Sequence, residues 1–312
     1  MKKYFLKRIL AIIPIMFAVT IVTFLIVRAM PGDASTAYLM AKRVPVTKEN
    51  LEMAMHTLGL DRPLYEQYFI WVSQILQLDL GVSYMTKMPV AVELAKGFAY
   101  TVKLAALALL WLFVFCVPMG ILSAAKPGSV IDRITRVTGF LGSSIPSFWL
   151  GFILVQIFAI RLNWLPVSLA GGFKNLILPS ATIAAGYIPM YTRILRNSIL
   201  ENKKSPYVVY AKARGIDGRK IFLTHILKNS LIPLVTSLGM NLGGLLCGSV
   251  IVENVFSFPG LGRLIVEAIG GRDYPVIQGY ILLLALIFIL TNLLSDMVCA
   301  GLNPRMKLEG WQ

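Results

Sequence analysis

Long uncharged hydrophobic stretches alternate with polar segments along this chain. Six of them approach the ~20 residues that a helix needs to cross the hydrocarbon core of a bilayer. The fourth is the shortest. The pattern predicts an all-α membrane protein, with a single transmembrane domain over residues 1–312. The predicted transmembrane helices cover residues 9–27, 104–125, 137–160, 175–192, 229–252 and 274–295.

Composition agrees with this fold class. Hydrophobic residues make up 57% of the chain and charged residues 14%, whereas a soluble domain carries nearer a quarter charged residues. Eighteen Lys and Arg residues lie on the side that holds both termini, against ten on the other side. The positive-inside rule therefore predicts that both termini are cytoplasmic. The basic N-terminus resembles a signal peptide, but its apolar run is too long, so we expect a retained membrane span.

The segment between the first two spans, residues 31–97, is too long for a simple connection and is predicted to be extracytoplasmic. Residues 47–50 can cap a helix that ends before Gly59. A second helix is expected after Pro63, and its aromatic residues favour the membrane interface. The loop is either a small outer subdomain without a ligand role or part of the surface that receives a partner.

The third span is interrupted by the sequence Ser-Ser-Ile-Pro-Ser at residues 143–147. Pro146 removes a helical hydrogen bond, and nearby serines can satisfy the freed carbonyls. Such a kink can line a transport pathway, although plain helix packing is the commoner case. The residues that we predict as a possible pathway or gate are Ser143, Ser144, Pro146, Ser147 and Asn241.

A strongly basic segment, residues 193–228, joins the fourth and fifth spans and is predicted to be cytoplasmic. Its middle, from Tyr207 to Arg214, has the periodicity of a short helix. Gly215 ends that helix, Asp217 supplies turn chemistry, and a second helical run starts near Arg219. A short helix between two spans suits docking in the groove of another protein. The alternative is a positive loop that only fixes orientation.

The usual catalytic and metal-binding signatures are missing. No phosphate-binding glycine loop with its lysine is present. Met53 and His56 can share a helix face, but two neutral ligands make a weak metal site. The three cysteines have no metal spacing. Because the span centres lack charged residues, the energy source is expected to be external. The uneven placement of the +15 net charge argues against nucleic-acid binding.

The sequence YAKARGIDGRKIFLTHILKNSLIP, starting at Tyr210, resembles the EAA loop of ABC-importer permeases of the dipeptide, oligopeptide and nickel branch. Two positions depart from the general motif, because Val209 and Tyr210 stand where the family has a glutamate and an alanine. These departures are typical of the branch. The sequences PGD after the first span, LGLDRPLYEQYFIWV and LDLGVSY also resemble this branch. So does the segment from Glu253 to Gly262, which we interpret as a gate-lining or docking loop.

The resemblance implies the type I importer fold and a chain without its own ATPase site in a bacterial cytoplasmic membrane. It implies a heterodimer with a second permease subunit, two cytoplasmic ATPase subunits and an extracytoplasmic solute-binding protein. It implies no cofactor on this chain, since the partner subunits use the ATP. In the family the basic loop forms the helix that couples to the ATPase. The matching residues are Tyr207, Tyr210, Ala211, Arg214, Gly215 and Asp217.

The transported substrate is less defined by these motifs. The sequences NWLPVSLAGGFKNLILP, VPVTKENL and GRDYPVIQ look nearest to nickel and metallophore permeases, so a nickel or metal–chelator complex is our first expectation. A di- or oligopeptide permease is the alternative. An ion-coupled secondary transporter would share six spans, but it would usually carry intramembrane charges. A membrane-bound enzyme is the weakest alternative, because no site residues converge.

Overall fold

A computed structural model describes residues 2–30, 33–167, 172–247 and 249–302. These residues form helices and loops, with one isolated antiparallel bridge between Val82 and Pro89. The fold class is therefore all-α, as the sequence predicts. The chain forms two compact units. Unit 1 comprises Met1–Thr101 with Pro259–Leu290, and unit 2 comprises Val102–Phe258 with Thr291–Gln312.

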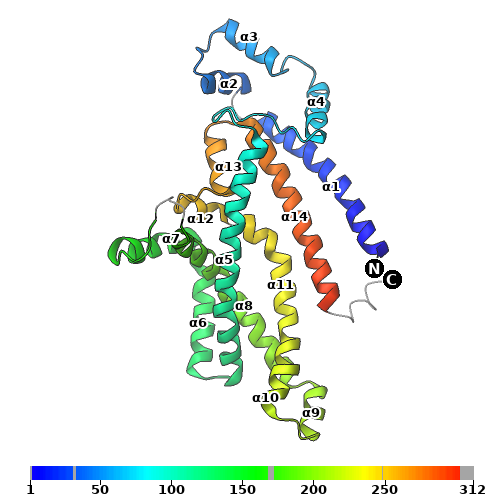
Figure 1. Ribbon diagram of the computed structural model, residues 1–312, viewed down its shortest axis with the longest axis vertical. Helices are drawn as coiled ribbons and strands as arrows, with labels where there is room; N and C mark the ends of the chain where they lie inside the picture. The colour runs from blue at the N-terminus through cyan, green and yellow to red at the C-terminus, as the bar shows by residue number, and fades with distance from the viewer. Residues whose placement is uncertain (1, 31–32, 168–171, 248, 303–312) are drawn as a thin grey trace. The chain divides into compact units, whose positions relative to one another are not determined.

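Unit 1 contains the first helix, the segment predicted to be extracytoplasmic, which we call the outer loop and which is described over residues 33–97, and the first part of the last helix. In Figure 1, α2 and α3 pack on each other, and α4 packs beside α1. Thr47 caps α3 through a hydrogen bond from Asn50 N, and Gly59 follows that helix with φ of +64°, as predicted. Its helices are α1 (Lys2–Ala29), α2 (Ala34–Lys42), α3 (Lys48–Thr57), α4 (Leu64–Leu76), α13 (Leu261–Gly270) and the first parts of α5 (Val90–Ala125) and α14 (Tyr274–Leu302).

One buried carboxylate ties the outer loop of unit 1 to the start of α14. Asp273 accepts hydrogen bonds from the hydroxyl of Ser83 at 2.5 Å and from the backbone N–H groups of Tyr84 and Met85 at 3.1 Å each. Burial of the Tyr84 hydroxyl, and next the negative charge of Asp273, raises the pKa of Tyr84 to about 12. Pro31 and Gly32, where the outer loop was predicted to start, lie outside the described residues.

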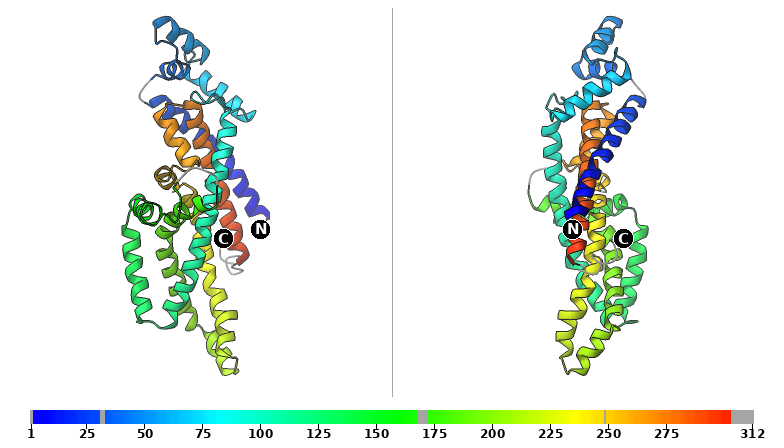
Figure 2. Two further views of the ribbon diagram at one scale, coloured as in Figure 1. Left: turned by 60° about the vertical axis from the view of Figure 1, so that its left-hand side comes forward. Right: turned by 90° about the vertical axis from the view of Figure 1, so that its right-hand side faces the viewer.

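Unit 2 is a bundle in which α6 and α11 lie alongside α8 (Figures 1 and 2). Gly239 of α11 allows close approach to α14, because a Cβ there would lie 2.5 Å from Ser295 Oγ. Besides the ends of α5 and α14, the unit contains α6 (Val130–Ser144), α7 (Ser147–Leu154), η1 (Val155–Arg161), α8 (Lys174–Lys203), α9 (Pro206–Ala213), α10 (Gly218–Ile221), η2 (Phe222–Leu227), α11 (Lys228–Cys247) and α12 (Ser249–Val255).

The helices differ from the predicted spans in two places. Four of the described helical stretches are long and apolar enough to cross a membrane: Leu10–Ala29, Val90–Ala125, Gly218–Leu246 and Tyr274–Val298. The third predicted span is not one helix, because α6 ends at Ser144 and α7 begins at Ser147. Its apolar part, Ser147–Arg161, is short. The fourth span lies within α8, which continues to Lys203 and carries charged residues in its last turns.

The segment from Glu253 to Gly262 is more ordered than a loop. Glu253 lies inside α12, is fully buried, and accepts a hydrogen bond from Ser249 at 2.8 Å. The prediction of one docking loop from residue 253 is therefore too broad, since only the residues between α12 and α13 lack helical structure. The turn residues Pro259 and Gly260 lie in that short connection.

Candidate coupling surface and pathway

The short helix α9 has a defined start and a defined end. Ser205 has extended backbone angles and Pro206 occupies the first helical position, where a missing N–H costs nothing. At the other end Gly215 has φ of +72°. Gly215 N donates to Lys212 O at 2.9 Å, and Ile216 N donates to Ala211 O at 3.2 Å. These two bonds form a Schellman motif, which requires the left-handed conformation that glycine adopts at low cost.

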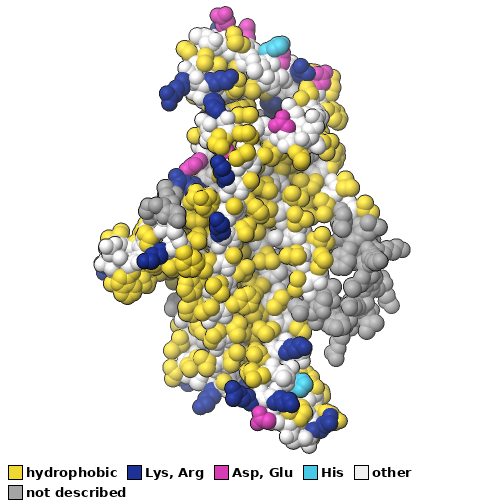
Figure 3. All heavy atoms as spheres, in the orientation of Figure 1, with side chains coloured by type: hydrophobic (Ala, Val, Ile, Leu, Met, Phe, Trp, Pro, Cys, Tyr) yellow, Lys and Arg dark blue, Asp and Glu magenta, His cyan; other side chains and the backbone are white. Residues whose placement is uncertain are grey.

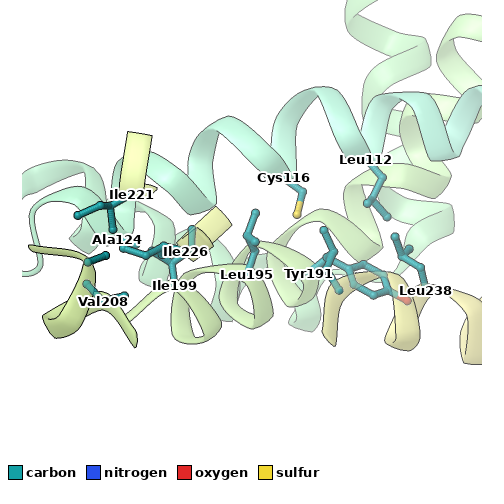
Figure 4. Close-up of a cluster of buried hydrophobic side chains, with 12 residues drawn as sticks. Leu112, Cys116, Ala124, Tyr191, Leu195, Ile199, Val208, Ile221, Ile226 and Leu238 are labelled. Carbon is teal, nitrogen blue, oxygen red and sulfur yellow. The ribbon is translucent and has the colours of Figure 1, made fainter. Parts of the chain in front are cut away.

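The two faces of α9 differ sharply in burial. Val208 and Ala211 are 1% and 6% exposed and belong to a core cluster with Ala124, Ile199 and Ile221 (Figure 4). On the opposite face, Val209 and Tyr210 are 61% and 64% exposed, and Tyr207 is partly exposed. We call Tyr207, Val209 and Tyr210 the outer face of α9. Ala211 was predicted as a coupling residue, but its side chain lies in the chain's own core.

Polar contacts hold α9 against α8 and α11. The hydroxyl of Tyr207 donates to Asn202 Oδ1 at 2.6 Å, and Asn202 Nδ2 donates to Ser230 Oγ at 3.2 Å. Lys203 Nζ donates to the carbonyl of Ala124 at 2.6 Å, at the end of α5. Burial lowers the pKa of Lys203, and the nearby charge of Lys212 lowers it further. The contacts of Tyr207 and Asn202 thus connect α9 with α8 and α11.

The surroundings of the outer face are basic. Arg214 stacks over the ring of Tyr210, with its Cζ 5.7 Å from the ring centroid. Asp217 caps α10 by accepting hydrogen bonds from Arg219 N and Lys220 N at 3.0 and 3.2 Å. In Figure 3, Lys and Arg side chains gather over the α9–α10 end of unit 2. An exposed aromatic pair surrounded by cations suits a partner surface with an apolar pocket and acidic residues.

Sequence reasoning missed a buried ion pair next to this region. Asp132, at the start of α6, is 1% exposed and contacts Arg196 of α8 at 2.6 Å. It also accepts hydrogen bonds from Ser123 Oγ at 2.6 Å and Gly128 N at 2.9 Å. The Arg196 guanidinium, followed by these two donors, holds the pKa of Asp132 well below its usual range. One sequence feature could have indicated this ion pair. Asp132 is the only acidic residue in the basic segment 126–136 that follows the second predicted span.

Of the predicted pathway residues, the three whose side chains the structure describes are not brought together. Pro146 caps α7 with φ of −62°, so the predicted kink is a complete helix break, and Ser147 is the first residue of α7. Asn241 donates to the carbonyl of Ser237 in its own helix at 2.9 Å. The side chains of Ser143 and Ser144 lie outside the described part of the structure. No described contact links Pro146, Ser147 and Asn241.

A cavity of about 350 Å³ lies beside this break within unit 2. Gly142 and Ile145 of the broken segment and Pro189 of α8 are among its walls. Pro189 Cγ comes within 2.7 Å of the position that a Cβ on Gly142 would take. Thr135, Thr138 and Thr192 supply the polar side chains of the cavity. Pro146, Ser147 and Asn241 do not line it. The cavity is therefore a better-defined candidate for a pathway wall than the residues chosen from sequence.

Metal ligands do not converge in the described structure. Within its described ranges, no group of three or more His, Cys, Asp or Glu side chains could hold a metal ion. Met53 is 62% exposed on α3. Cys116 is a buried free thiol in the core of unit 2.

Comparison with known proteins agrees with this architecture. Residues 116–308 match the model of the binding-protein-dependent transport system inner membrane component family, and residues 1–105 match the N-terminal membrane component model of the same transport systems. The chain belongs to this family of ABC-importer permeases. It is thus a multi-pass permease of the inner membrane, and ATP hydrolysis takes place in separate subunits.

Among curated proteins, the chain is 41% identical over 309 residues to the glutathione transport system permease protein GsiC of Pectobacterium atrosepticum. It is 39% identical over 309 residues to GsiC of Escherichia coli strain K12. Both alignments cover 99% of this chain and 100% of the relative. These relatives agree with the peptide-type alternative better than with the nickel expectation.

Among solved structures, the fold is similar to an inward-facing form of the MetNI methionine ABC transporter, with a TM-score of 0.55 and 18% identity. That match covers 68% of this chain and 96% of the solved chain. The crystal structure of an amino acid ABC transporter with histidines gives a TM-score of 0.52 at 16% identity, covering 69% of this chain and 94% of the other. These likenesses concern the fold, and they agree with the type I importer architecture expected from the sequence.

Proposed function

We propose that this chain is the permease subunit of an importer for small peptides of the class that includes glutathione. The observation that carries the proposal is its identity of 39–41% to glutathione permeases over 99% of its length. The relatives give the nickel or metal–chelator expectation no comparable support. The absence of a metal-ligand group among the described side chains does not favour it either.

The proposed assembly pairs this chain with a second permease subunit, two cytoplasmic ATPase subunits and an extracytoplasmic solute-binding protein. The charge distribution supports both termini in the cytoplasm. In this arrangement the chain binds no cofactor, and the partner subunits use the ATP. Peptide selectivity would then rest mainly on the solute-binding protein and on the size and polarity of the path.

The outer face of α9 is the proposed contact with an ATPase subunit. Its side chains are exposed, while its inner face is bonded into the core of unit 2. Movement of the ATPase would act on Tyr207, Val209 and Tyr210 and reach α8 and α11 through Asn202 and Ser230. Arg214, Gly215 and Asp217 would shape the end of the contact, and Ala211 would support it from inside.

The proposed path runs past the break between α6 and α7. Ser143, Ser144, Pro146, Ser147 and Asn241 remain candidate pathway or gate residues. The hydroxyls of Thr135, Thr138 and Thr192 in the neighbouring cavity each donate to a carbonyl of their own helix, so their oxygens can accept a hydrogen bond from a peptide. A mainly apolar wall with a few uncharged hydroxyl groups suits weak, transient contacts with a solute.

Uptake measurements test the proposal. A strain lacking the endogenous peptide and nickel importers would express the complete transporter with its solute-binding protein. We expect it to accumulate radiolabelled glutathione in an ATP-dependent manner, with an unlabelled dipeptide competing and nickel having no effect. Val209→Asp should abolish uptake by placing a charge in the ATPase contact, while Lys204→Gln should not. Uptake of labelled nickel with no uptake of peptide would overturn the substrate assignment.

A further inference from the structure

Unit 1 contains a cavity of about 850 Å³ that the permease function does not explain. This volume lies within the range of small-molecule sites. The cavity is lined by the end of α1, by α2 to α4, by the turn before α5 and by the start of α14. All of these segments belong to unit 1, so the walls come from one compact body.

Four cations from four separate segments line this cavity. Arg28 comes from the end of α1, Lys42 from the end of α2, Arg62 from the connection before α4, and Lys87 from the turn before α5. Within the described residues, none of the four forms an ion pair with a carboxylate. A cavity that focuses unpaired positive charge raises the local concentration of anions.

The carboxylates that line the same cavity are already engaged with local backbone. Asp33 caps α2 by accepting from Ser35 N at 3.1 Å and also accepts from the Ser35 hydroxyl. Asp79 accepts from Gly81 N at 2.8 Å. These contacts use the acids as caps and turn formers. Both carboxylates stay charged, but four cations against two carboxylates leave the lining with an excess of positive charge.

Aromatic rings hold two of the cations in place. Lys42 Nζ lies 4.3 Å from the ring centroid of Tyr38, and Arg28 Cζ lies 5.2 Å from that of Phe24. Lys87 Nζ donates to the carbonyl of Tyr84, which also lines the cavity. Trp71 adds a further aromatic surface. Positioned cations beside apolar walls suit a ligand with carboxylates and short hydrophobic or neutral groups between them.

We propose that this cavity binds the carboxylate groups of a small anionic peptide, with Arg28, Lys42, Arg62 and Lys87 as the anion-binding side chains. The inference rests on the proposed peptide substrate and adds a site on the permease itself, separate from the solute-binding protein. Glutathione has more carboxylates than ammonium groups at neutral pH and fits this charge requirement. A neutral peptide would lose the charge-assisted hydrogen bonds that the cavity offers.

Equilibrium dialysis on the assembled transporter tests the site. The complex, without its solute-binding protein, would be placed in phosphatidylcholine nanodiscs and titrated with radiolabelled glutathione at low salt. We expect saturable binding that weakens with added salt and that diglutamate displaces. The uncharged N-acetyl-alanyl-alanine amide should not displace it.

Variants identify the cavity as the binding site. Arg62→Gln and Lys87→Gln should each raise the apparent Kd at least about fivefold, since each removes a charge-assisted hydrogen bond. Arg62→Lys should restore much of the affinity. Lys48→Gln is the matched control, because Lys48 is an exposed outer-loop cation that does not line the cavity. Co-elution of all subunits would show that each variant is folded and assembled.

The outcomes separate this inference from the proposed function. Unchanged affinity in the Arg62→Gln/Lys87→Gln double variant would overturn the site. If binding of the radiolabel responds to added phosphatidylglycerol and not to added peptide, the cavity is a lipid-headgroup site and the proposal is also overturned. If the complete transporter imports glutathione while the cavity binds no anionic peptide, only this inference fails. If the cavity binds diglutamate while the complete transporter imports no peptide, the proposed function fails instead.

Discussion

Arg196 holds Asp132 by two parallel hydrogen bonds, from Nε to Oδ1 at 2.6 Å and from Nη2 to Oδ2 at 3.0 Å. The pair joins the start of α6 to α8, and α8 leads directly into α9. Ser123 and Gly128 donate further hydrogen bonds to the carboxylate, and Arg136 Nη2 lies 3.5 Å from Asp132 Oδ2. The connection between α5 and α6 is thereby fixed to the helix that carries the proposed coupling surface.

Asp132→Asn should destabilise the protein by about 3 kcal/mol, because it leaves the guanidinium of Arg196 without its charge partner in a poorly solvated site. Thermal unfolding of the purified complex would measure this loss. Glu267→Gln is the control, since it removes the partly exposed Arg263–Glu267 pair and should change stability by less than about 1 kcal/mol. Equal effects of the two variants would contradict a structural role for Asp132.

The same carboxylate should give stability a defined pH dependence. The pKa of Asp132 is lower in the folded chain than in the unfolded chain. Its stabilising contribution is therefore complete above about pH 5 and is lost as the pH falls below about 4 and approaches the folded pKa. Melting temperatures of the wild type and of Asp132→Asn should differ by a constant amount between pH 7 and pH 5 and converge at lower pH. A constant difference down to about pH 3 would show that another group is responsible.

Tyr210→Ala and Ala211→Asp should both impair the transporter, the first through the ATPase contact and the second through the stability of the permease. Tyr210 is exposed, so its truncation should leave thermal stability unchanged while reducing co-elution with the ATPase and peptide-stimulated hydrolysis about tenfold or more, as for an interface hot spot. Ala211 is buried, so aspartate there should lower the stability of the permease itself. Lys204→Gln, at an exposed position before α9, should alter neither property. Normal hydrolysis in Tyr210→Ala would exclude the outer face of α9 as the coupling contact.

Gly215→Val should impair coupling through backbone strain alone. No atom lies within 4 Å of the Cβ that a side chain would add, but the residue has φ of +72°. A non-glycine residue in this region costs about 1–2 kcal/mol, and more when it is β-branched. Gly215→Asn should retain most stimulated ATP hydrolysis, since asparagine tolerates the left-handed conformation. If valine and asparagine have equal effects, the Schellman motif is not the reason for glycine here.

Labelling of introduced cysteines should test the proposed orientation. Lys48→Cys in the outer loop should react with a membrane-impermeant maleimide in intact cells. Lys204→Cys, just before α9, should react only after the cells are permeabilised. Both positions are exposed, so access to reagent is limited by the membrane. Labelling of Lys204→Cys in intact cells would contradict the cytoplasmic placement of α9.

Local signals in the sequence predicted the short helices well. Thr47 and Gly59 bound α3 as expected, and Gly215 follows the end of α9 as expected, because caps and left-handed glycines act within a few residues. The third span was harder to predict. Pro146 was recognised as a kink, but hydrophobicity alone could not show that the chain leaves the helix completely between Ser144 and Ser147.

The candidate site was predictable only in part, for a related reason. Helical periodicity placed Ala211 and Tyr210 on the same short helix, but which face is buried depends on Ile199 and Ile221 from other elements. The partnership of Asp132 and Arg196 spans 64 positions in the chain, and no local pattern encodes it. The four cations of the outer cavity are likewise scattered, and they converge only when unit 1 is folded.

The fixed ends of α9 have a consequence for insertions and deletions. Between Pro206 and Gly215, each added or removed residue turns the following side chains by about 100° around the helix axis. A single deletion before Tyr210 would bring Ala211 toward the outer face and Lys212 toward the core. The segment should therefore accept substitutions at the exposed Lys212 during evolution while its length stays constant, whereas Val209 is restricted by the proposed ATPase contact.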